Sequence, residues 1–168
     1  MVLTKPELIA SLQNEVQILL HLATKIDRAK LDYRPTPKQR STIELLRYLS
    51  MMGPALVQAA KAGAFDGAAW AAAEQAAAAQ SYEQALAAIA AQPGTYAALL
   101  ADVSEADLRA EVDPFGAGKT SRGAFLVNQV LCGCAAYRTQ LFLYLKACGR
   151  EELSTWNLWV GMDEPPKA

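Results

Sequence analysis

The stretch Ser41-Thr42-Ile43-Glu44-Leu45-Leu46-Arg47-Tyr48-Leu49 decides the fold class, because it opens a long amphipathic helix. Its Ser41, followed three residues later by Glu44, forms a capping box, which satisfies backbone N–H groups at the start of a helix. Glycine at position 63 is a typical C-terminal stop, and Gly53-Pro54 is a point at which the helix can kink. Apolar residues recur between these ends at the spacing of one helical face: Leu45, Leu46, Leu49, Met52, Leu56 and Ala60.

Three further stretches have the same helical character. One begins at a second capping box, Thr4–Glu7, and its apolar face continues to Ile26. Another begins at Ser81 with Gln84, and Pro93-Gly94 is expected to break or bend it. The last predicted helix runs from about residue 121 to 147 and stops at a glycine.

Four long helices in one chain of 168 residues predict an all-α fold, a four-helix bundle formed as a single domain over residues 1–168. The connections are longer than minimal turns. Residues 33–40 form a proline-punctuated loop, and the alanine-rich residues 67–80 are expected to be a helical or loosely ordered surface connector. Residues 153–168 are predicted to be an extended tail that packs on the bundle.

The tail contains large apolar residues, Trp156 and Trp159, without a helical pattern. We expect them to be buried over the end of the chain's own bundle. The alternative is a contact between two copies of the chain, because exposed aromatic clusters often mark interfaces. A homodimer is therefore a possible assembly.

Composition and charge exclude several classes of function. Lys and Arg number 16 against 17 Asp and Glu, so the chain has no basic excess for nucleic-acid binding. The alanine-rich stretch is interrupted by Glu74 and Glu83, so no membrane span is expected, and Lys5 and Glu7 argue against a secretory leader. An odd number of cysteines favours a reducing, cytoplasmic location over a disulfide framework: Cys132, Cys134 and Cys148.

An ordered set of motifs extends the opening stretch. Tyr33-Arg34-Pro35 precedes Ser41–Leu49, then comes Val130-Leu131-Cys132-Gly133-Cys134-Ala135-Ala136-Tyr137-Arg138-Thr139-Gln140-Leu141, and last Ser154–Asp163. In this order the motifs resemble the second helix, the fourth helix and a tail of the DinB-like (DinB/YfiT) superfamily. The resemblance implies a four-helix bundle that holds a metal ion on three histidines and often pairs through its helices.

This chain departs from the resemblance at the metal positions. The three histidines of the family fall on Tyr48, Gly133 and Tyr137. Glycine has no side chain, and a phenol must lose a proton to bind a metal well. The one histidine, His21, lies roughly opposite the apolar face of the first helix, so it is expected on the surface. We therefore expect a divergent member with no metal and no cofactor.

The same positions suggest a pocket. Gly133, Tyr137, Gln140 and Tyr144 share one face of the last helix, and in the family arrangement Tyr48 faces them. One hypothesis is a small-molecule pocket in which phenol hydroxyls donate hydrogen bonds. The other is that the tyrosines replaced the metal and filled its cavity.

Arg138 is also a candidate site residue. Its expected role is a buried ion pair with Glu44 or Asp163, and the alternative is a clamp for an anionic substrate. Cys132 and Cys134 point about 200° apart on a helix, so they are expected to be small packing residues rather than a metal or disulfide pair. The segment 116–120 has the end of a phosphate-binding motif but lacks its first glycine and the preceding strand, which excludes that motif.

The sequence therefore predicts a metal-free bundle that binds a small molecule or has a structural or interaction role, with no catalytic residue assigned. The alternative is a divergent enzyme resembling thiol-dependent transferases or metal-dependent hydrolases. Such an enzyme would need another device, for example Tyr48 or Tyr137 acting as a general acid with a strongly lowered pKa. A third possibility is a partner-binding module that uses the tail.

Overall fold

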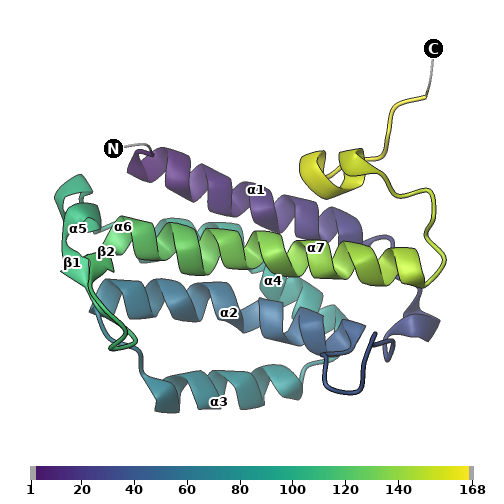
Figure 1. Cartoon of the computed structure of the whole chain (residues 1–168), viewed down its shortest axis with the longest axis horizontal. Coiled ribbons are helices and arrows are strands. Elements are labelled where there is room, and N and C mark those ends of the chain that lie inside the picture. Colours follow the sequence, from purple (N-terminus) through teal and green to yellow (C-terminus); the bar gives the residue numbers. More distant parts are fainter. Residues whose placement is uncertain (1–2, 167–168) are drawn as a thin grey trace.

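A computed structural model describes residues 3–166 and shows an all-α fold (Figure 1). The four predicted long helices are present. The last of them is one continuous rod built from three consecutive pieces. The long elements are α1 (Lys5–Ala23), α2 (Thr42–Ala62), α4 (Tyr82–Leu99) and the rod formed by α6 (Arg122–Phe125), the π-helical η2 (Leu126–Leu131) and α7 (Cys132–Ala147).

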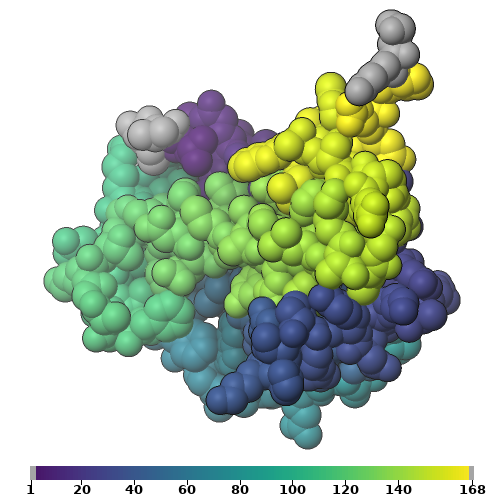
Figure 2. All heavy atoms as spheres, turned by 45° about the vertical axis from the view of Figure 1, so that its right-hand side comes forward, coloured from purple at the N-terminus to yellow at the C-terminus, as the bar shows by residue number. Residues whose placement is uncertain are grey.

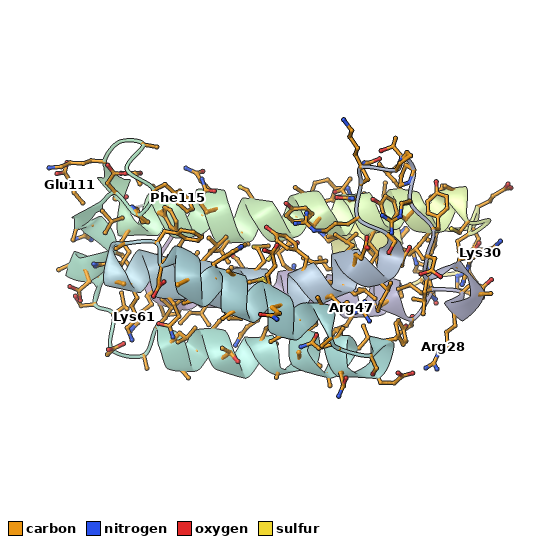
Figure 3. All side chains as sticks on the ribbon, turned by 90° about the horizontal axis from the view of Figure 1, so that it is seen from below. Arg28, Lys30, Arg47, Lys61, Glu111 and Phe115 are labelled. Atoms are coloured by element: carbon orange, nitrogen blue, oxygen red, sulfur yellow. The ribbon has the colours of Figure 1, made fainter. Side chains whose placement is uncertain are left out.

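Shorter elements lie in the connections and in the C-terminal tail. Figure 3 shows the connection that contains Glu111 and Phe115 near one end of the bundle, and the one that contains Arg28 and Lys30 at the other. The strands form only a two-residue antiparallel ladder, with Glu111 opposite Ser121. The short elements are the 3-10 turn η1 (Arg28–Lys30), α3 (Gly67–Ala78), α5 (Glu105–Arg109), β1 (Glu111–Val112), β2 (Thr120–Ser121) and the π-helical η3 (Trp156–Val160).

The capping boxes at Thr4, Ser41 and Ser81 are all formed and start α1, α2 and α4. Helix α4 packs against both α1 and α2, and α7 also contacts both, so the four rods enclose one core. Burying these side chains supplies the main favourable free energy of folding. Fully buried core residues come from every rod: Leu12, Leu22, Leu45, Leu46, Ile89, Leu126 and Leu141.

A buried amide explains why α2 continues through its proline. Pro54 has no N–H to offer the carbonyl of Ser50, four residues earlier. Gln92 of α4 supplies the missing donor, because its Nε2 lies 3.1 Å from the Ser50 oxygen and 2.7 Å from the Leu49 oxygen. The Oε1 of the same amide accepts from the Tyr96 hydroxyl at 3.0 Å. The network is buried and joins α2 to α4.

Of the two expectations for Pro93-Gly94, a break or a bend, the break is wrong, since α4 runs without interruption from Tyr82 to Leu99. The turns on either side are held by burial of Gln92 and Tyr96 against α2, and this packing outweighs one missing backbone hydrogen bond. The alanine-rich segment is an ordered helix, α3. Asp66 caps it by accepting from two of its backbone N–H groups, and it lies on the outside of α2 (Figure 1).

The prediction of an extended tail is wrong in part, because residues 156–160 form the helical turn η3. The expected burial of the tryptophans is also wrong. Asn157 is buried, whereas Trp156 and Trp159 are 39% and 66% exposed. Only one face of a short helical turn can contact the bundle, and here that face carries the asparagine. None of the helices within residues 3–166 combines the length and the hydropathy needed to cross a membrane.

Candidate functional site

Two phenol rings from different helices meet beside a glycine. The rings of Tyr48 on α2 and Tyr137 on α7 lie edge to face, with centroids 5.1 Å apart. Gly133 lies one helical turn before Tyr137. The three positions that the resemblance assigns to histidine thus lie together. They border a cleft of about 340 Å³, which we call the tyrosine cleft, lined by Tyr48, Met52, Leu56, Asn128, Gln129, Cys132, Gly133, Ala136 and Tyr137.

The surroundings of Tyr48 favour its neutral phenol. Burial, and then the neighbouring Tyr137, raise the pKa of Tyr48 far above its ordinary value. The Arg40 guanidinium lies over the ring, 3.8 Å from its centroid, and opposes the shift only in part. Trp70 of α3 packs against the same ring at 6.1 Å. Tyr48 is therefore suited to hydrogen bonding as a neutral phenol, and its pKa moves opposite to the direction that the general-acid hypothesis requires.

The wall of the cleft contains two amide side chains that the sequence did not predict there. Asn128 and Gln129 lie in the π-helical segment η2, and both are exposed at the cleft. In a π-helix the hydrogen bonds run from i to i+5, as from the Cys132 N–H to the Val127 carbonyl, so side chains rotate away from their α-helical positions. Periodicity based on 3.6 residues per turn could not have placed these amides.

Gln140 and Tyr144 do not line the tyrosine cleft. They border a separate hollow of about 520 Å³ nearer the C-terminal end of α7. The Tyr144 hydroxyl donates to the Arg40 carbonyl at 2.9 Å, and the Gln140 amide donates to that hydroxyl. Tyr144 lies seven positions after Tyr137 in the helix, which is roughly 10 Å along the axis. The expectation of one pocket around all these side chains is therefore wrong, and Tyr144 joins the last helix to the loop before α2.

Arg138 faces away from the cleft and lies in the core with 4% of its side chain exposed. Its Nε is 2.8 Å from the Glu15 carboxylate of α1, and one guanidinium N–H donates to the Leu158 carbonyl. The predicted ion-pair role is present, but both predicted partners are wrong. Those carboxylates pair elsewhere, Glu44 with Arg34 and Asp163 with Lys25.

The position of Arg138 follows from helical geometry. Successive residues of an α-helix are rotated by about 100°, so Arg138 and Tyr137 face different neighbours. Since Glu15 already matches its charge, Arg138 is not available as an anion clamp. The expectation that His21 is on the surface is also wrong, because the tail covers it and leaves 16% of its side chain exposed.

The remaining candidates stay apart. Cys132 is exposed and Cys134 is buried, and both are free thiols. Within residues 3–166, no three His, Cys, Asp or Glu side chains are close enough to share one metal ion. In the turn between β1 and β2, the Asp113 carboxylate accepts from the backbone N–H groups of Ala117 and Gly118. A phosphate would need those same N–H groups.

Comparisons with known proteins identify the fold. No protein-family model matches the sequence, and no curated protein matches it either. Among solved structures, the chain is similar to a DinB-like protein, YjoA, from Bacillus subtilis. The TM-score is 0.66 at 20% sequence identity, and the match covers 88% of this chain and 94% of that one. The similarity agrees with the order of the motifs in the sequence and with the four packed rods. The chain therefore has the DinB-like fold.

Proposed function

We propose that this chain binds a neutral, planar organic molecule in the tyrosine cleft and does so without a bound metal ion. The observation that carries the proposal is the open space beside Gly133 and the paired rings of Tyr48 and Tyr137. Its volume of about 340 Å³ falls within the usual range for ligand pockets, roughly 300–1,000 Å³. Tyrosines that simply filled a lost metal site would have closed this space.

The chemistry of the walls favours a neutral ligand. Within residues 3–166, the side chains lining the cleft include no charged group. They provide two phenols, the amides of Asn128 and Gln129, and an apolar floor of Met52 and Leu56. A buried charge without a partner would be strongly disfavoured there. Aromatic edges and faces instead suit a flat ring, and the amides and phenols suit carbonyl and N–H groups at its rim.

The competing proposal is an enzyme, resembling thiol-dependent transferases or metal-dependent hydrolases. Catalysis by a tyrosine general acid or base works best when the pKa lies near the working pH. The raised pKa of Tyr48 counts against this device. We therefore assign no catalytic residue. We also propose a cytoplasmic location, which the three free cysteines support because free thiols persist in a reducing compartment.

A set of matched probes tests the proposal. Benzamide, benzoate and benzylammonium share one ring and differ in charge, so each is titrated into untagged protein while backbone amide NMR signals are recorded. We expect benzamide to shift the signals of Gly133 and Tyr137 saturably, and the two charged probes to do so far less. No saturable shift with benzamide, or equal shifts with all three, would contradict the proposal.

A pair of glycine variants locates the binding. Gly133→Leu fills the cleft, whereas Gly94→Leu adds the same side chain on α4, where a Cβ meets nothing within 4 Å. Benzamide shifts should disappear in the first variant and persist in the second. Calorimetric titration with Zn²⁺ or Ni²⁺ tests the proposal that the cleft holds no metal ion. One metal ion bound tightly per chain would overturn that proposal if the binding is lost when Tyr48 and Tyr137 are changed to phenylalanine.

A second candidate is self-association through the tail. Trp159, Val160 and Met162 are 66%, 52% and 45% exposed and follow one another closely in the chain. Exposed large apolar side chains that lie close together often mark an interface, and a second copy could bury them. Sedimentation of the wild type against Trp159→Gln tests this. A dimer that the substitution dissociates supports the candidate, and a monomeric wild type excludes it.

A further inference from the structure

The C-terminal segment is fastened to the bundle at defined points, and we call residues 153–163 the strap. Its helical turn η3 packs against α1 and α7, and Figure 2 shows the C-terminal segment lying on the yellow-green end of the last rod. Leu153 is buried at its start. At its end Gly161 lies so close to α1 that an added Cβ would stand 3.1 Å from the Ile18 backbone. The strap therefore fits its surface closely at both ends.

A buried amide holds the middle of the strap. The Asn157 Oδ1 accepts from the Ser154 N–H at 2.8 Å, and the Asn157 Nδ2 donates to Asp163 Oδ1 at 2.9 Å. These two partners fix which side of the amide is oxygen and which is nitrogen. The second N–H of Nδ2 then faces His21 Nε2, 3.0 Å away on α1. With the amide in this orientation the ring nitrogen accepts, which corresponds to a neutral imidazole with its proton on Nδ1, and Asp163 Oδ1 lies 3.6 Å from Nε2.

The net effect of the surroundings of His21 on its pKa also favours the neutral imidazole. Burial, and then Lys25 on the same helix, lower the pKa of His21, and Asp163 on the strap opposes them. The Asp163 carboxylate is already held by Lys25, with 2.6 Å between Nζ and Oδ1. Two cations of α7 also contact the strap: Arg138 donates to the Leu158 carbonyl and Lys146 to the Leu153 carbonyl, and the partner of Arg138, Glu15, lies on α1.

We propose that the strap is a pH-sensitive latch, which docks while His21 is neutral and lifts when Nε2 takes up a proton. A proton on Nε2 would place two N–H donors against each other, and Asn157 would lose its contact with α1. Lifting would uncover Ile18 and the Glu15–Arg138 pair on the face of α1 that the strap covers.

The direction of the pH dependence follows from linkage. Burial, to which the docked strap contributes, is the largest cause that lowers the pKa of His21 below its ordinary value of 6.5, so the docked state binds the proton less well than the lifted state. Docking is at full strength above pH 6.5 and weakens as the pH falls below it. One proton changes the docking equilibrium by at most about tenfold per pH unit. The carboxylate of Asp163, whose pKa is lowered, titrates in a more acidic range.

The first test reads the tautomer directly. His21 is the only histidine in the sequence, so in untagged protein its ring nitrogens give the only imidazole signals. Long-range ¹H–¹⁵N correlation at pH 7.5 should show a protonated Nδ1 and a bare Nε2. A protonated Nε2 at that pH would overturn the proposal, and no variant is needed to reach the answer.

The second test follows the strap itself. In a Trp70→Phe background the remaining tryptophans, Trp156 and Trp159, both lie on the strap. Acrylamide quenching of their fluorescence should rise between pH 7.5 and 5, while far-ultraviolet circular dichroism of the helices stays constant. His21→Gln keeps an acceptor but cannot titrate, so its quenching should stay at its pH 7.5 value throughout. If the wild type shows no rise, or if His21→Gln shows the same rise, then the latch is not governed by His21.

Discussion

The two faces of helix α7 differ in character, although their residues are neighbours in the sequence. One face buries Cys134, Arg138 and Leu141, and its arginine pairs with Glu15 of α1. The other carries Gly133 and Tyr137 and borders the open tyrosine cleft. We call the first the anchoring face, because its side chains fix α7 to the core, and the second forms a wall of the cleft. Substitutions on the two faces of this one helix should therefore differ in their effects on stability and on ligand binding.

Arg138→Met should have the largest effect. It leaves the Glu15 carboxylate, which is 12% exposed, without its partner, and removes the contact to the Leu158 carbonyl. Breaking a buried ion pair from one side costs about 3–5 kcal/mol, and urea unfolding at pH 7 measures this loss. The double variant Glu15→Leu with Arg138→Met should recover most of it. A loss below about 1 kcal/mol in the single variant would mean that this face is no better anchored than a surface pair.

Two helical glycines, Gly53 and Gly133, differ in the space available around them. A Cβ on Gly53 of α2 would overlap the Tyr96 hydroxyl in the buried network, so Gly53→Ala should destabilise by about 1–3 kcal/mol. A Cβ on Gly133 meets Met52 Cε at 3.6 Å, an ordinary contact. Gly133→Ala should therefore stabilise the helix by roughly 0.5–1 kcal/mol. Thermal unfolding of both variants shows whether each substitution raises or lowers stability. Equal destabilisation would contradict the conclusion that Gly53 is tightly packed and Gly133 is not.

The helices could be predicted from the sequence because their signals are local. Capping boxes at Thr4, Ser41 and Ser81 and apolar spacing specify where α1, α2 and α4 begin and which face is buried. The neighbouring positions of Tyr48, Gly133 and Tyr137 followed from the resemblance. The continuity of α4 through Pro93 could not be predicted, since it depends on Gln92 and Tyr96 packing against another helix.

The partner of Arg138 could not be predicted for a related reason. A helical wheel shows that Arg138 and Tyr137 face apart, but Glu15 becomes the partner only when the rotation of α1 against α7 is known. The amides of Asn128 and Gln129 depend on the π-helical segment, for which the sequence has no clear signal. The contact of His21 with Asn157 depends on where the strap docks.

Tyr144→Phe tests whether the C-terminal end of α7 belongs to the anchoring face or to the cleft. The Tyr144 hydroxyl is buried between the Arg40 carbonyl and the Gln140 amide, so its loss leaves both without a partner. We expect a loss of about 1–2 kcal/mol in urea unfolding, with unchanged benzamide binding. Tyr137→Phe is the matched control on the cleft. It should cost less stability and weaken the probe more, and the reverse order would contradict the two roles.

The smallest effect concerns how the anchoring face depends on pH. Burial raises the pKa of Glu15 above its ordinary 4.5, and Arg138 opposes the shift. The folded chain then holds this proton more tightly than the unfolded chain, so the contribution of Glu15 to stability is full below pH 4.5 and is lost as the pH rises through the folded pKa. Glu15→Gln removes the titration, and unfolding of both proteins between pH 4 and 7 isolates it. The stability of the wild type relative to Glu15→Gln should fall with rising pH, by about 1.4 kcal/mol for each unit by which the pKa is raised. A relative stability that rises instead would mean that attraction to Arg138 outweighs burial, and that the anchor is strongest when both groups are charged.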